Sequence, residues 1–370
     1  MSLLQPDTAA ALAAILHQAA QDRQTIETGG AFTKIRAGGP RGTATVVIST
    51  AKLNRVLNYE PRDLTISVEA GMPMVALSAL LAKNQQMIPL DPPFANHATI
   101  GGVVATNSSG PRRRWFGTAR DLVIGMQYAT MEGKLVQSGG MVVKNVAGLD
   151  TGKLHIGALG TLGVMTVINF KLLPMPVGSR TYAREFANAA EVIAERDRIL
   201  KSTLQPMALD LLNPAAARTL GMTGFVLLLE AGGAPNVLDR YARELPGFAV
   251  LDHGLWPRIS NFTEEFLVGR PAGCVVRISS KLTETAQVLD AFTTGPVILR
   301  AGNGVAYAFC DTVPSALPAL KCVVEYAPEP RPAGVNLWPA PGGDFDLMRR
   351  VKDMMDPHRL LNPGRLYGKL

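Results

Sequence analysis

Hydrophobic and polar residues alternate over positions 64–70, Leu64-Thr65-Ile66-Ser67-Val68-Glu69-Ala70, and the run ends at Gly71. This period of two predicts a half-buried strand closed by a turn. Residues 44–48 and 164–172 are further β-rich runs, and residues 73–83 carry apolar positions at helical spacing. The first half of the chain is therefore expected to mix strands with helices.

A second helical pattern lies near the amino terminus. Leu12, Ile15, Leu16 and Ala19 follow the spacing i, i+3, i+4 and i+7, and Asp7 precedes them as a candidate capping acid. We expect a surface helix here that packs on the first domain.

The pattern changes after Pro174 and Pro176, which we take as the first domain boundary. Helices are predicted over 189–201 and 237–245, with Pro235 at the first helical position of the second. Strands are predicted over 208–212, 225–230, 274–278, 297–300, 305–310 and 323–326. Asn303-Gly304 reads as a tight hairpin turn between two of these strands. Strands and helices at such short spacing predict an antiparallel α+β layer, and a last helix is predicted over 345–355.

Composition excludes several classes of protein. The chain has 370 residues, of which 47% are apolar and only 18% charged, so intrinsic disorder is excluded. Its three cysteines, Cys274, Cys310 and Cys322, show no C-x-x-C spacing and are too few for a disulfide scaffold or an iron–sulfur cluster. No run reaches the roughly 18 apolar residues of a membrane span, and nothing resembles an export signal. We therefore expect a cytoplasmic protein whose membrane contact, if it has any, comes through a partner.

Three glycine clusters in the first half suit a phosphate group. They are Thr28-Gly29-Gly30-Ala31-Phe32-Thr33-Lys34, Thr99-Ile100-Gly101-Gly102 and Asn107-Ser108-Ser109-Gly110. Glycine allows backbone N–H groups to converge on one anion, and short Thr, Ser and Asn side chains add neutral donors. Neither G-x-x-x-x-G-K-[ST] nor a G-x-G-x-x-G that opens a helix is present. Each cluster alone is more often a turn, but the three together favour a bound phosphorylated cofactor. The net charge of +7 fits such an anion, an acidic partner or, more remotely, nucleic acid.

The ordered set of motifs resembles a known family. Ala98-Thr99-Ile100-Gly101-Gly102, Gly110-Pro111-Arg112-Arg113, the stretch 139–150 and Gly160-Thr161-Leu162-Gly163-Val164 are similar to the FAD-binding domain of the vanillyl-alcohol oxidase/PCMH flavoproteins. Together with the distant Asn362-Pro363-Gly364-Arg365, they most resemble the FAD-binding (E) subunits of bacterial glycolate oxidases.

This resemblance implies the fold. The expected class is α+β: a PCMH-type FAD-binding domain of two α/β subdomains over 1–175, a reduced, cap-like antiparallel domain over 176–330, and a C-terminal helix and tail over 331–370 that returns to the FAD domain.

The resemblance also implies a set of cofactor-binding residues. They are Thr28, Gly29, Gly30, Thr33, Lys34, Pro92, Thr99, Ile100, Gly101, Gly102, Thr106, Asn107, Ser108, Ser109, Gly110, Lys144, Gly160, Gly163, Val164 and Asn362. Relatives that tether FAD use His or Cys near these loops, and no Cys occurs before Cys274, so FAD is expected to be non-covalent. His97 is either an attachment site or an ordinary loop histidine. Asp150 is either catalytic or a capping or buried structural acid, and Lys144 either contacts the cofactor or forms an ion pair.

The second half lacks one feature that the resemblance leads us to look for. Catalytic relatives carry a metal-binding histidine cluster in their substrate domain, whereas residues 299–307 keep the glycines and an asparagine without a histidine. After residue 170 the histidines are His253 and His358, too far apart in sequence for a ligand pair. We expect no metal, and the catalytic residues stay unknown.

Other residues of the second half have two interpretations each. Arg258, Arg277 and Arg300 are candidates for anchoring an anion, although a solvated or interfacial arginine is the commoner case. Tyr307 and Trp256 are expected to be packing residues. Arg112-Arg113-Arg114-Trp115 is a basic run that we assign to a loop over the flavin or to a subunit contact rather than to nucleic acid.

The resemblance implies an oxidoreductase function. The chain would bind FAD within a glycolate oxidase complex that converts glycolate to glyoxylate, beside a catalytic FAD subunit and an iron–sulfur subunit, in an electron-transfer or structural role. Two alternatives stay open: a stand-alone FAD-dependent dehydrogenase for 2-hydroxy acids such as D-lactate, and a non-catalytic scaffold subunit. The expected location is cytoplasmic, with peripheral contact to the inner face of the membrane through partners.

Overall fold

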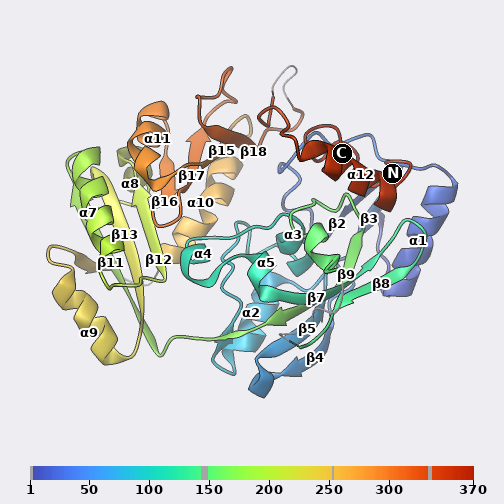
Figure 1. Ribbon diagram of the computed structural model, residues 1–370, viewed down its shortest axis with the longest axis horizontal. Helices are drawn as coiled ribbons and strands as arrows, with labels where there is room; N and C mark the ends of the chain where they lie inside the picture. Colours follow the sequence, from blue (N-terminus) through green and yellow to red (C-terminus); the bar gives the residue numbers. More distant parts are fainter. Residues whose placement is uncertain (1–2, 143–148, 252–253, 332–335) are drawn as a thin grey trace. The chain divides into compact units, whose positions relative to one another are not determined.

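The chain folds into two compact units, which are described separately. A computed structural model describes residues 3–142, 149–251, 254–331 and 336–370. Unit 1 comprises Met1–Ser109, Thr118–Met175 and Ala340–Leu370, and unit 2 comprises Gly110–Gly117 and Pro176–Pro339 (Figure 1). The predicted boundaries of the three domains stay a prediction.

Unit 1 begins with a small parallel sheet. Its strands follow the order β1 (Leu3–Leu4), β3 (Val46–Ser49) and β2 (Ile26–Gly29). Helix α1 (Ala9–Gln21) buries Leu12 and Leu16 against Ile26 and Ile48 of this sheet, as the helical spacing predicts. Its cap is Thr8, whose hydroxyl accepts the Ala11 N–H at 3.1 Å, so the prediction of Asp7 as the cap was wrong. A threonine at this position satisfies an N–H group that the helix itself leaves unpaired.

A larger antiparallel sheet forms the rest of the unit 1 framework. Its order is β4 (Val56–Glu60), β5 (Thr65–Glu69), β9 (Val164–Lys171), β7 (Val123–Ala129) and β8 (Leu135–Gly139). Helices α2 (Met74–Ala82) and α3 (Ile100–Ala105) share its hydrophobic core. Helix α12 (Phe345–Met355) and five shorter elements complete the unit: β6 (Gln86–Met87), β10 (Leu173–Pro174), α5 (Ala119–Leu122), α6 (Gly152–His155) and a 3-10 turn at Pro61–Asp63.

Strand β5 differs from its prediction in burial. All five of its residues are buried, so the expectation of a half-buried strand was wrong. The polar positions are buried because other parts of the chain satisfy them. The Glu69 carboxylate, for example, accepts hydrogen bonds from the Arg55 guanidinium at 2.7 Å and from the Arg55 backbone N–H at 2.8 Å.

Unit 2 is built on one antiparallel sheet, as the short spacing of its elements predicts. Its eight strands lie in the order β14 (Ala249–Leu251), β11 (Gly178–Phe186), β13 (Phe225–Gly233), β12 (Ala208–Leu212), β16 (Val297–Arg300), β17 (Val305–Cys310), β15 (Cys274–Ser279) and β18 (Lys321–Tyr326). Strands β16 and β17 pair directly across Asn303-Gly304, which confirms the predicted hairpin.

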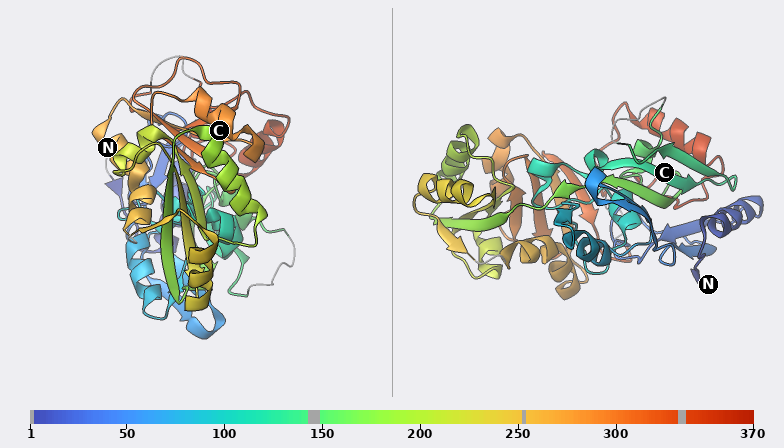
Figure 2. Two further views of the ribbon diagram at one scale, coloured as in Figure 1. Left: turned by 90° about the vertical axis from the view of Figure 1, so that its left-hand side faces the viewer. Right: turned by 90° about the horizontal axis from the view of Figure 1, so that it is seen from below.

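Helices cover both faces of this sheet. On one face, α7 (Ala189–Lys201), α9 (Pro235–Glu244) and α11 (Thr285–Ala291) pack on alternate strand residues in the core of unit 2. On the other face lies α10 (Leu255–Gly269) (Figure 2). Its Phe262 and Phe266 pack against Phe309 at ring distances of 4.7 and 5.3 Å. The short helices α8 (Pro214–Thr219) and α4 (Arg113–Phe116) and the 3-10 turn at Leu282–Glu284 complete the unit.

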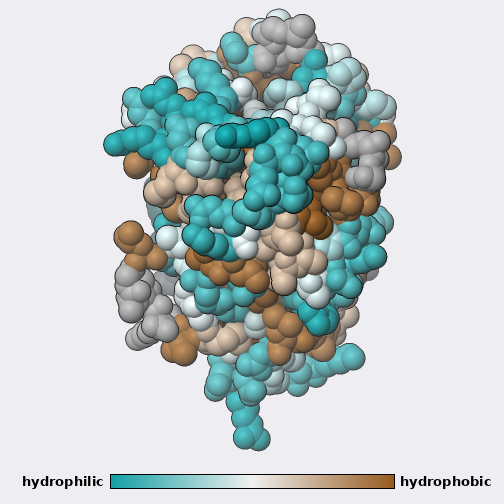
Figure 3. Space-filling model, turned by 90° about the vertical axis from the view of Figure 1, so that its right-hand side faces the viewer, coloured by the Kyte–Doolittle hydropathy of each residue, from teal (hydrophilic) through white to brown (hydrophobic). Residues whose placement is uncertain are grey.

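Apolar side chains also reach the surface. On α12, for example, Leu347 and Met354 are largely exposed. On the face shown in Figure 3, hydrophobic residues gather in separate patches among hydrophilic ones. Among the described residues, no helix has both the length and the apolar character to cross a bilayer.

Candidate functional site

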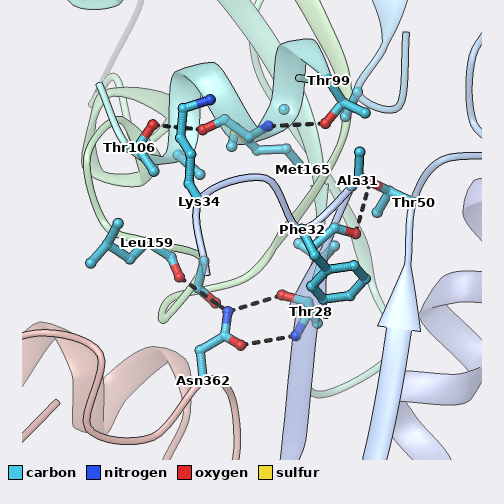
Figure 4. A pocket seen from close by; sticks show the side chains of 18 of the residues that line it. Thr28, Ala31, Phe32, Lys34, Thr50, Thr99, Thr106, Leu159, Met165 and Asn362 are labelled. Carbon is cyan, nitrogen blue, oxygen red and sulfur yellow. Dashed lines mark hydrogen bonds between the residues drawn. The ribbon is translucent and has the colours of Figure 1, made fainter. Parts of the chain in front are cut away.

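A cavity in unit 1 is lined by six separate parts of the chain (Figure 4). They are residues 27–35 at the end of β2 and in the loop after it, Thr50, Ala70, helix α3 with its flanking threonines, the entry to β9, and the carboxyl-terminal residues Asn362 and Arg365. The space, including the part open to solvent, is about 820 Å³.

The loop after β2 presents backbone donors. In the described part of the chain, the N–H groups of Gly30, Ala31, Phe32 and Thr33 donate to no acceptor. Phe32 has a φ of 54°, so the chain turns sharply at this point. Consecutive N–H groups in a turn form a concave site for an anion. The loop therefore has the donors that the sequence predicts for phosphate.

Two carboxyl-terminal side chains hold this loop in place. Asn362 accepts the Thr28 N–H at 2.9 Å and donates to the Thr28 hydroxyl, the Leu159 carbonyl and the Gly160 carbonyl at 3.0 to 3.1 Å. The Arg365 guanidinium donates to the carbonyls of Ile35 and Gly39 at 3.1 Å and of Ala37 at 2.5 Å. Since every partner is a fixed backbone or short side-chain group, these two residues set the shape of the cavity wall.

The opposite wall of the cavity is the first turn of α3. The Thr99 hydroxyl accepts the Gly102 N–H at 3.4 Å, and the Thr106 hydroxyl donates to the Gly102 carbonyl at 2.7 Å. A Cβ atom on Gly30 would lie 1.9 Å from the Thr99 hydroxyl oxygen. The loop and the helix can therefore approach this closely only because residue 30 is glycine.

Besides Arg365, a lysine lines the cavity. Lys34 is only 7% exposed, and its ammonium group lies 5.9 Å from the centre of the Phe94 ring. A buried ammonium group beside the N–H donors of the same loop adds positive charge to the cavity wall. This charge complements an anionic ligand.

The structure brings most of the predicted site residues together at this cavity. Those that line it are Thr28, Gly29, Gly30, Thr33, Lys34, Thr99, Gly101, Gly102, Thr106, Gly160, Gly163, Val164 and Asn362. Ten further lining residues were not among the predicted cofactor-binding residues, although Ala31 and Phe32 belong to the first glycine cluster: Glu27, Ala31, Phe32, Ile35, Thr50, Ala70, Ala105, Leu159, Met165 and Arg365. Of these, Arg365 follows Asn362 within one motif, and that motif was a signal that could have identified it.

Seven predicted residues do not line this cavity. Pro92 and Ile100 are buried elsewhere in unit 1, and Gly110 belongs to unit 2. Lys144 lies outside the described residues. Asn107, Ser108 and Ser109 follow α3. Ser108 bonds to Thr106 at 2.7 Å, whereas Asn107 Oδ1 and Ser109 Oγ are buried without a partner in the described part of the chain.

Two further residues from the sequence also lie away from the cavity. His97 and Asp150 are both exposed. Asp150 accepts a hydrogen bond from Ser138 at 3.4 Å, so its interpretation as a buried acid was wrong. Neither residue is among those that line the cavity.

A different histidine is buried in unit 1. His155 is 2% exposed, and its ring lies 3.9 Å from that of Tyr128. Burial lowers the pKa of His155 to about 4, and its Nε2 atom has no partner among the described residues. The side chain is therefore neutral near pH 7 and acts as a packing residue beside Gly163, whose Cβ would lie 3.0 Å from the His155 ring.

We expect His155 to make the folded chain less stable in mild acid. Between its unfolded pKa of about 6.5 and its folded pKa of about 4, the unfolded chain binds a proton that the folded chain does not, so stability falls as the pH falls. From about pH 7 to about pH 5 this loss is about 2 kcal/mol. Urea unfolding of His155→Phe at both pH values should show a correspondingly smaller loss than the wild type. The exposed His17→Gln is the control, and equal losses in all three proteins would contradict the assignment.

Unit 2 carries a charged row on the sheet face opposite α7, α9 and α11, the face on which α10 also packs. Arg300 and Asp210 are directly opposite each other on β16 and β12 and form a buried ion pair. Glu230 of β13 accepts hydrogen bonds from Nε and Nη2 of Arg112 at 2.9 and 2.8 Å. The segment Gly110–Gly117 therefore lies across this face of the sheet.

Arg114 and Gly302 fit closely on the same face. Arg114 donates to the Pro206 carbonyl at 3.3 Å, and a Cβ on Gly302 would lie 2.1 Å from the Arg114 Cδ atom. Burial lowers the pKa of Arg114. The absence of a side chain at Gly302 thus leaves room for the Arg114 side chain.

The row continues over the next three strands of the sheet. Arg300 stacks over Tyr307 with 5.4 Å between the guanidinium carbon and the ring centre, and Arg277 lies 3.8 Å from Glu325. Burial raises the pKa of Glu325, and Arg277 and Arg113 oppose this shift. Arginines 112, 113, 114, 277 and 300 outnumber the acids 210, 230 and 325 on this face, so it has an excess of positive charge.

Arg258 and Trp256, which the sequence analysis also considered, have structural roles. Arg258 is exposed and donates to the Thr219 carbonyl at 3.1 Å. Trp256 is 6% exposed and donates its indole N–H to Thr181 at 3.0 Å, as a packing residue does. Of the three predicted anion anchors, only Arg277 and Arg300 lie in the charged row.

Comparison with known proteins gives consistent matches. Residues 2–139 match the FAD binding domain family, and residues 340–366 match the C-terminal domain of FAD linked oxidases. Glycolate oxidase subunit GlcE of Escherichia coli (strain K12) is 30% identical over 98% of this chain and 99% of its own length. Glycolate oxidase subunit GlcD of Bacillus subtilis (strain 168) is 24% identical over 100% of this chain and 89% of its own length. Among solved structures, an alkyldihydroxyacetonephosphate synthase shares the fold with a TM-score of 0.72 and 18% identity, over 98% of this chain and 75% of its own.

Proposed function

Because this chain belongs to the FAD-linked oxidase family that includes the glycolate oxidase subunit GlcE, we propose that it is the FAD-binding E-type subunit of a glycolate oxidase complex. In this proposal the complex oxidises glycolate to glyoxylate and also contains a catalytic FAD subunit and an iron–sulfur subunit. The cofactor of the family is FAD, which when bound supplies an acceptor for the hydride of a hydroxy acid.

The four N–H groups over Gly30–Thr33 that have no acceptor among the described residues carry this proposal. FAD has a pyrophosphate group, and such a loop would hold it through its N–H groups, with Lys34 supplying a cation. Thr99 and Thr106 would provide hydroxyl groups on the other wall of the cavity. The residues present therefore fit the cofactor.

A role inside a complex is supported by the second half of the sequence. In the catalytic relatives that this chain resembles, the segment equivalent to residues 299–307 contains glycines and histidines. This chain has the glycines but no histidine there, and Arg300 and Tyr307 of the segment belong to the charged row. Because Arg300 is already paired with the buried Asp210, it is committed to the fold. We therefore assign turnover to the catalytic subunit and electron transfer or structural completion to this chain.

The proposal is tested by purifying the chain alone and together with its two expected partners. We expect a yellow chain whose flavin is released by denaturation, because it is not covalently bound, and a complex that oxidises glycolate only when this chain is present. A colourless chain whose omission leaves glycolate oxidation intact would overturn the proposal.

A second candidate function rests on the charged row of unit 2. A hydroxy-acid site needs a cation for the carboxylate and a base for the hydroxyl proton, and Arg277 and Glu325 lie 3.8 Å apart with the pKa of Glu325 raised by burial. Stand-alone oxidation of a 2-hydroxy acid such as D-lactate is the activity that this pair would serve. Anaerobic bleaching of the flavin in the isolated chain by glycolate or D-lactate would favour it over the complex-bound role.

Asn362 gives a specific prediction for cofactor binding. In Asn362→Asp the three N–H···O contacts to Thr28, Leu159 and Gly160 are lost, and a carboxylate then faces two carbonyls. We expect the FAD dissociation constant to rise at least about tenfold, equivalent to about 1.4 kcal/mol. Fluorescence titration of the apoprotein with FAD measures it. An unchanged dissociation constant would show that this tether does not shape the site.

We also propose a cytoplasmic location with membrane contact through the partner subunits. The described helices show no candidate membrane span. Fractionation of cells that express the chain with and without its partners tests this, because recovery in the membrane fraction should require the partners.

A further inference from the structure

Two of the three cysteines lie directly opposite each other in the unit 2 sheet. Cys274 begins β15, Cys310 ends β17, and the two residues are paired in the antiparallel register of these strands. Residues opposite each other on neighbouring antiparallel strands point to the same face of the sheet. Accordingly, Cys274 belongs to the core of unit 2 and Cys310 packs against that core.

This register meets the geometric requirement for a disulfide. Opposite residues on antiparallel strands have Cα atoms about 4.5 to 5.5 Å apart, and a disulfide needs about 4.4 to 6.8 Å. Cys322 is opposite Ile278, four residues further along β15. At about 3.3 Å per residue it is therefore about 13 Å from Cys274 along the strand, too far to form a bond. Geometry thus selects one of the three pairings.

The two thiols differ in exposure. Cys274 is fully buried and Cys310 is partly exposed. The Cys274 thiol also contacts the Thr312 carbonyl at 3.7 Å, which places it at the end of the sheet where the chain leaves β17. A reagent from solvent would therefore reach Cys310 first and find Cys274 behind it.

The thiols also differ in acidity. A hydrogen bond with the Cys274 thiol lowers the pKa of Cys310, although burial and Asp311 oppose this shift. Burial raises the pKa of Cys322 to about 11. The thiolate is the reactive form of cysteine, and a reactive, accessible thiol beside a second cysteine is the arrangement of reversible oxidation sites.

We propose that Cys274 and Cys310 form a reversible disulfide within the chain when the protein meets hydrogen peroxide. The Cys310 thiolate sulfur attacks one peroxide oxygen, the O–O bond breaks, and a sulfenic acid and hydroxide are formed. The Cys274 thiol then loses its proton and attacks the Cys310 sulfur, the S–O bond breaks, and the oxygen leaves as water. Two thiols lose two electrons in total, and one peroxide becomes two waters. A dithiol reductant reverses the bond by thiol–disulfide exchange.

The disulfide would join two strands that are distant in sequence. It would close a loop that contains α11 and β16, so it would constrain the unfolded chain and stabilise unit 2. We expect the midpoint of thermal unfolding to rise on oxidation and to return after treatment with dithiothreitol.

The test counts thiols in the full chain before and after peroxide. The reduced protein is treated with hydrogen peroxide, quenched with catalase, denatured and titrated for thiols, and its peptides are mapped without reduction. We expect the thiol count to fall from three to one, with a linked peptide pair that contains Cys274 and Cys310 and a free Cys322. A count that stays at three, or links that involve Cys322 or a second chain, would overturn the proposal.

Two variants check the order of the steps. In Cys322→Ser the count should fall from two to zero with the same link, because Cys322 takes no part. In Cys274→Ser the link is impossible, so the Cys310 sulfenic acid should accumulate and be trapped by dimedone. If dimedone labels no cysteine of this variant while the wild type still forms the link, Cys310 is not the first residue to react and the proposed mechanism is wrong.

Discussion

Replacing Gly30 by valine is expected to leave the purified protein without flavin. The added Cβ would lie 1.9 Å from the Thr99 hydroxyl oxygen and 2.8 Å from the Thr99 Cβ, so the loop and the first turn of α3 would have to separate. The N–H groups over Gly30–Thr33 would then be displaced from the positions in which we propose that they hold the pyrophosphate. We expect the FAD dissociation constant to rise by at least about 100-fold, or about 2.7 kcal/mol, measured by titration of the apoprotein.

The matched control for this variant is Gly343→Val. Gly343 also belongs to unit 1, its ϕ is not in the left-handed region, and nothing lies within 4 Å of the position of its Cβ. Circular dichroism and thermal unfolding of the two apoproteins separate a loss of binding from a loss of folding. If folded Gly30→Val bound FAD with the affinity of Gly343→Val, the assignment of this loop to the cofactor would be wrong.

Replacing Lys352 by methionine is expected to cost about 3 kcal/mol of unfolding free energy. The Lys352 side chain is 1% exposed, and its ammonium group donates to Asp356 and to the Thr161 carbonyl at 2.7 Å and to the Leu361 carbonyl at 2.9 Å. Methionine fills a similar volume but leaves a buried carboxylate without its cation and two carbonyls without a donor. Removing one partner of a buried ion pair is far more destabilising than removing an exposed pair.

The same helix offers the control. Arg349 pairs with Asp346 at 2.9 Å, but both side chains are more than half exposed, so Arg349→Met should cost less than about 1 kcal/mol. Urea unfolding of both variants measures the difference. Because Asp356 also accepts the Leu361 N–H at 2.8 Å, and Asn362 follows Leu361, we expect Lys352→Met to bind FAD more weakly as well. Equal stability of the two variants would contradict this account.

Local patterns predicted much of the fold. The predicted bounds of α7, β12, β16, β17 and α12 agree with those in the structure. Helix α10 was not predicted, although Trp256, Ile259, Phe262 and Phe266 lie on one helical face, and it contains Pro257 in its first turn. Proline is tolerated in the first turn of a helix, where its missing N–H is not needed. The burial of polar positions in β5 could not be predicted, since it depends on distant residues such as Arg55.

The residues of the candidate site also include some that the sequence predicts and some that only the fold reveals. Glycine clusters and the carboxyl-terminal motif identified most of the residues that line the cavity, because positions where backbone segments approach closely require glycine. Ile100 lies inside one of these clusters yet is fully buried in the core, since successive residues of a helix point in different directions. Leu159, Thr50 and Met165 line the cavity but carry no chemical signal of their own. Only the fold brings them there.

The tether between Asn362 and Thr28 has a consequence for synthesis of the protein. The two residues are 334 positions apart, yet Asn362 accepts a hydrogen bond from the Thr28 N–H at 2.9 Å. This bond fixes the cavity wall around Thr28. On the ribosome the loop 27–35 is therefore made more than 300 residues before its anchor. Contacts between residues so distant in sequence form late in folding. The nascent chain is therefore expected to acquire full affinity for FAD only after translation has passed residue 365, so a chain truncated before Asn362 should bind flavin weakly.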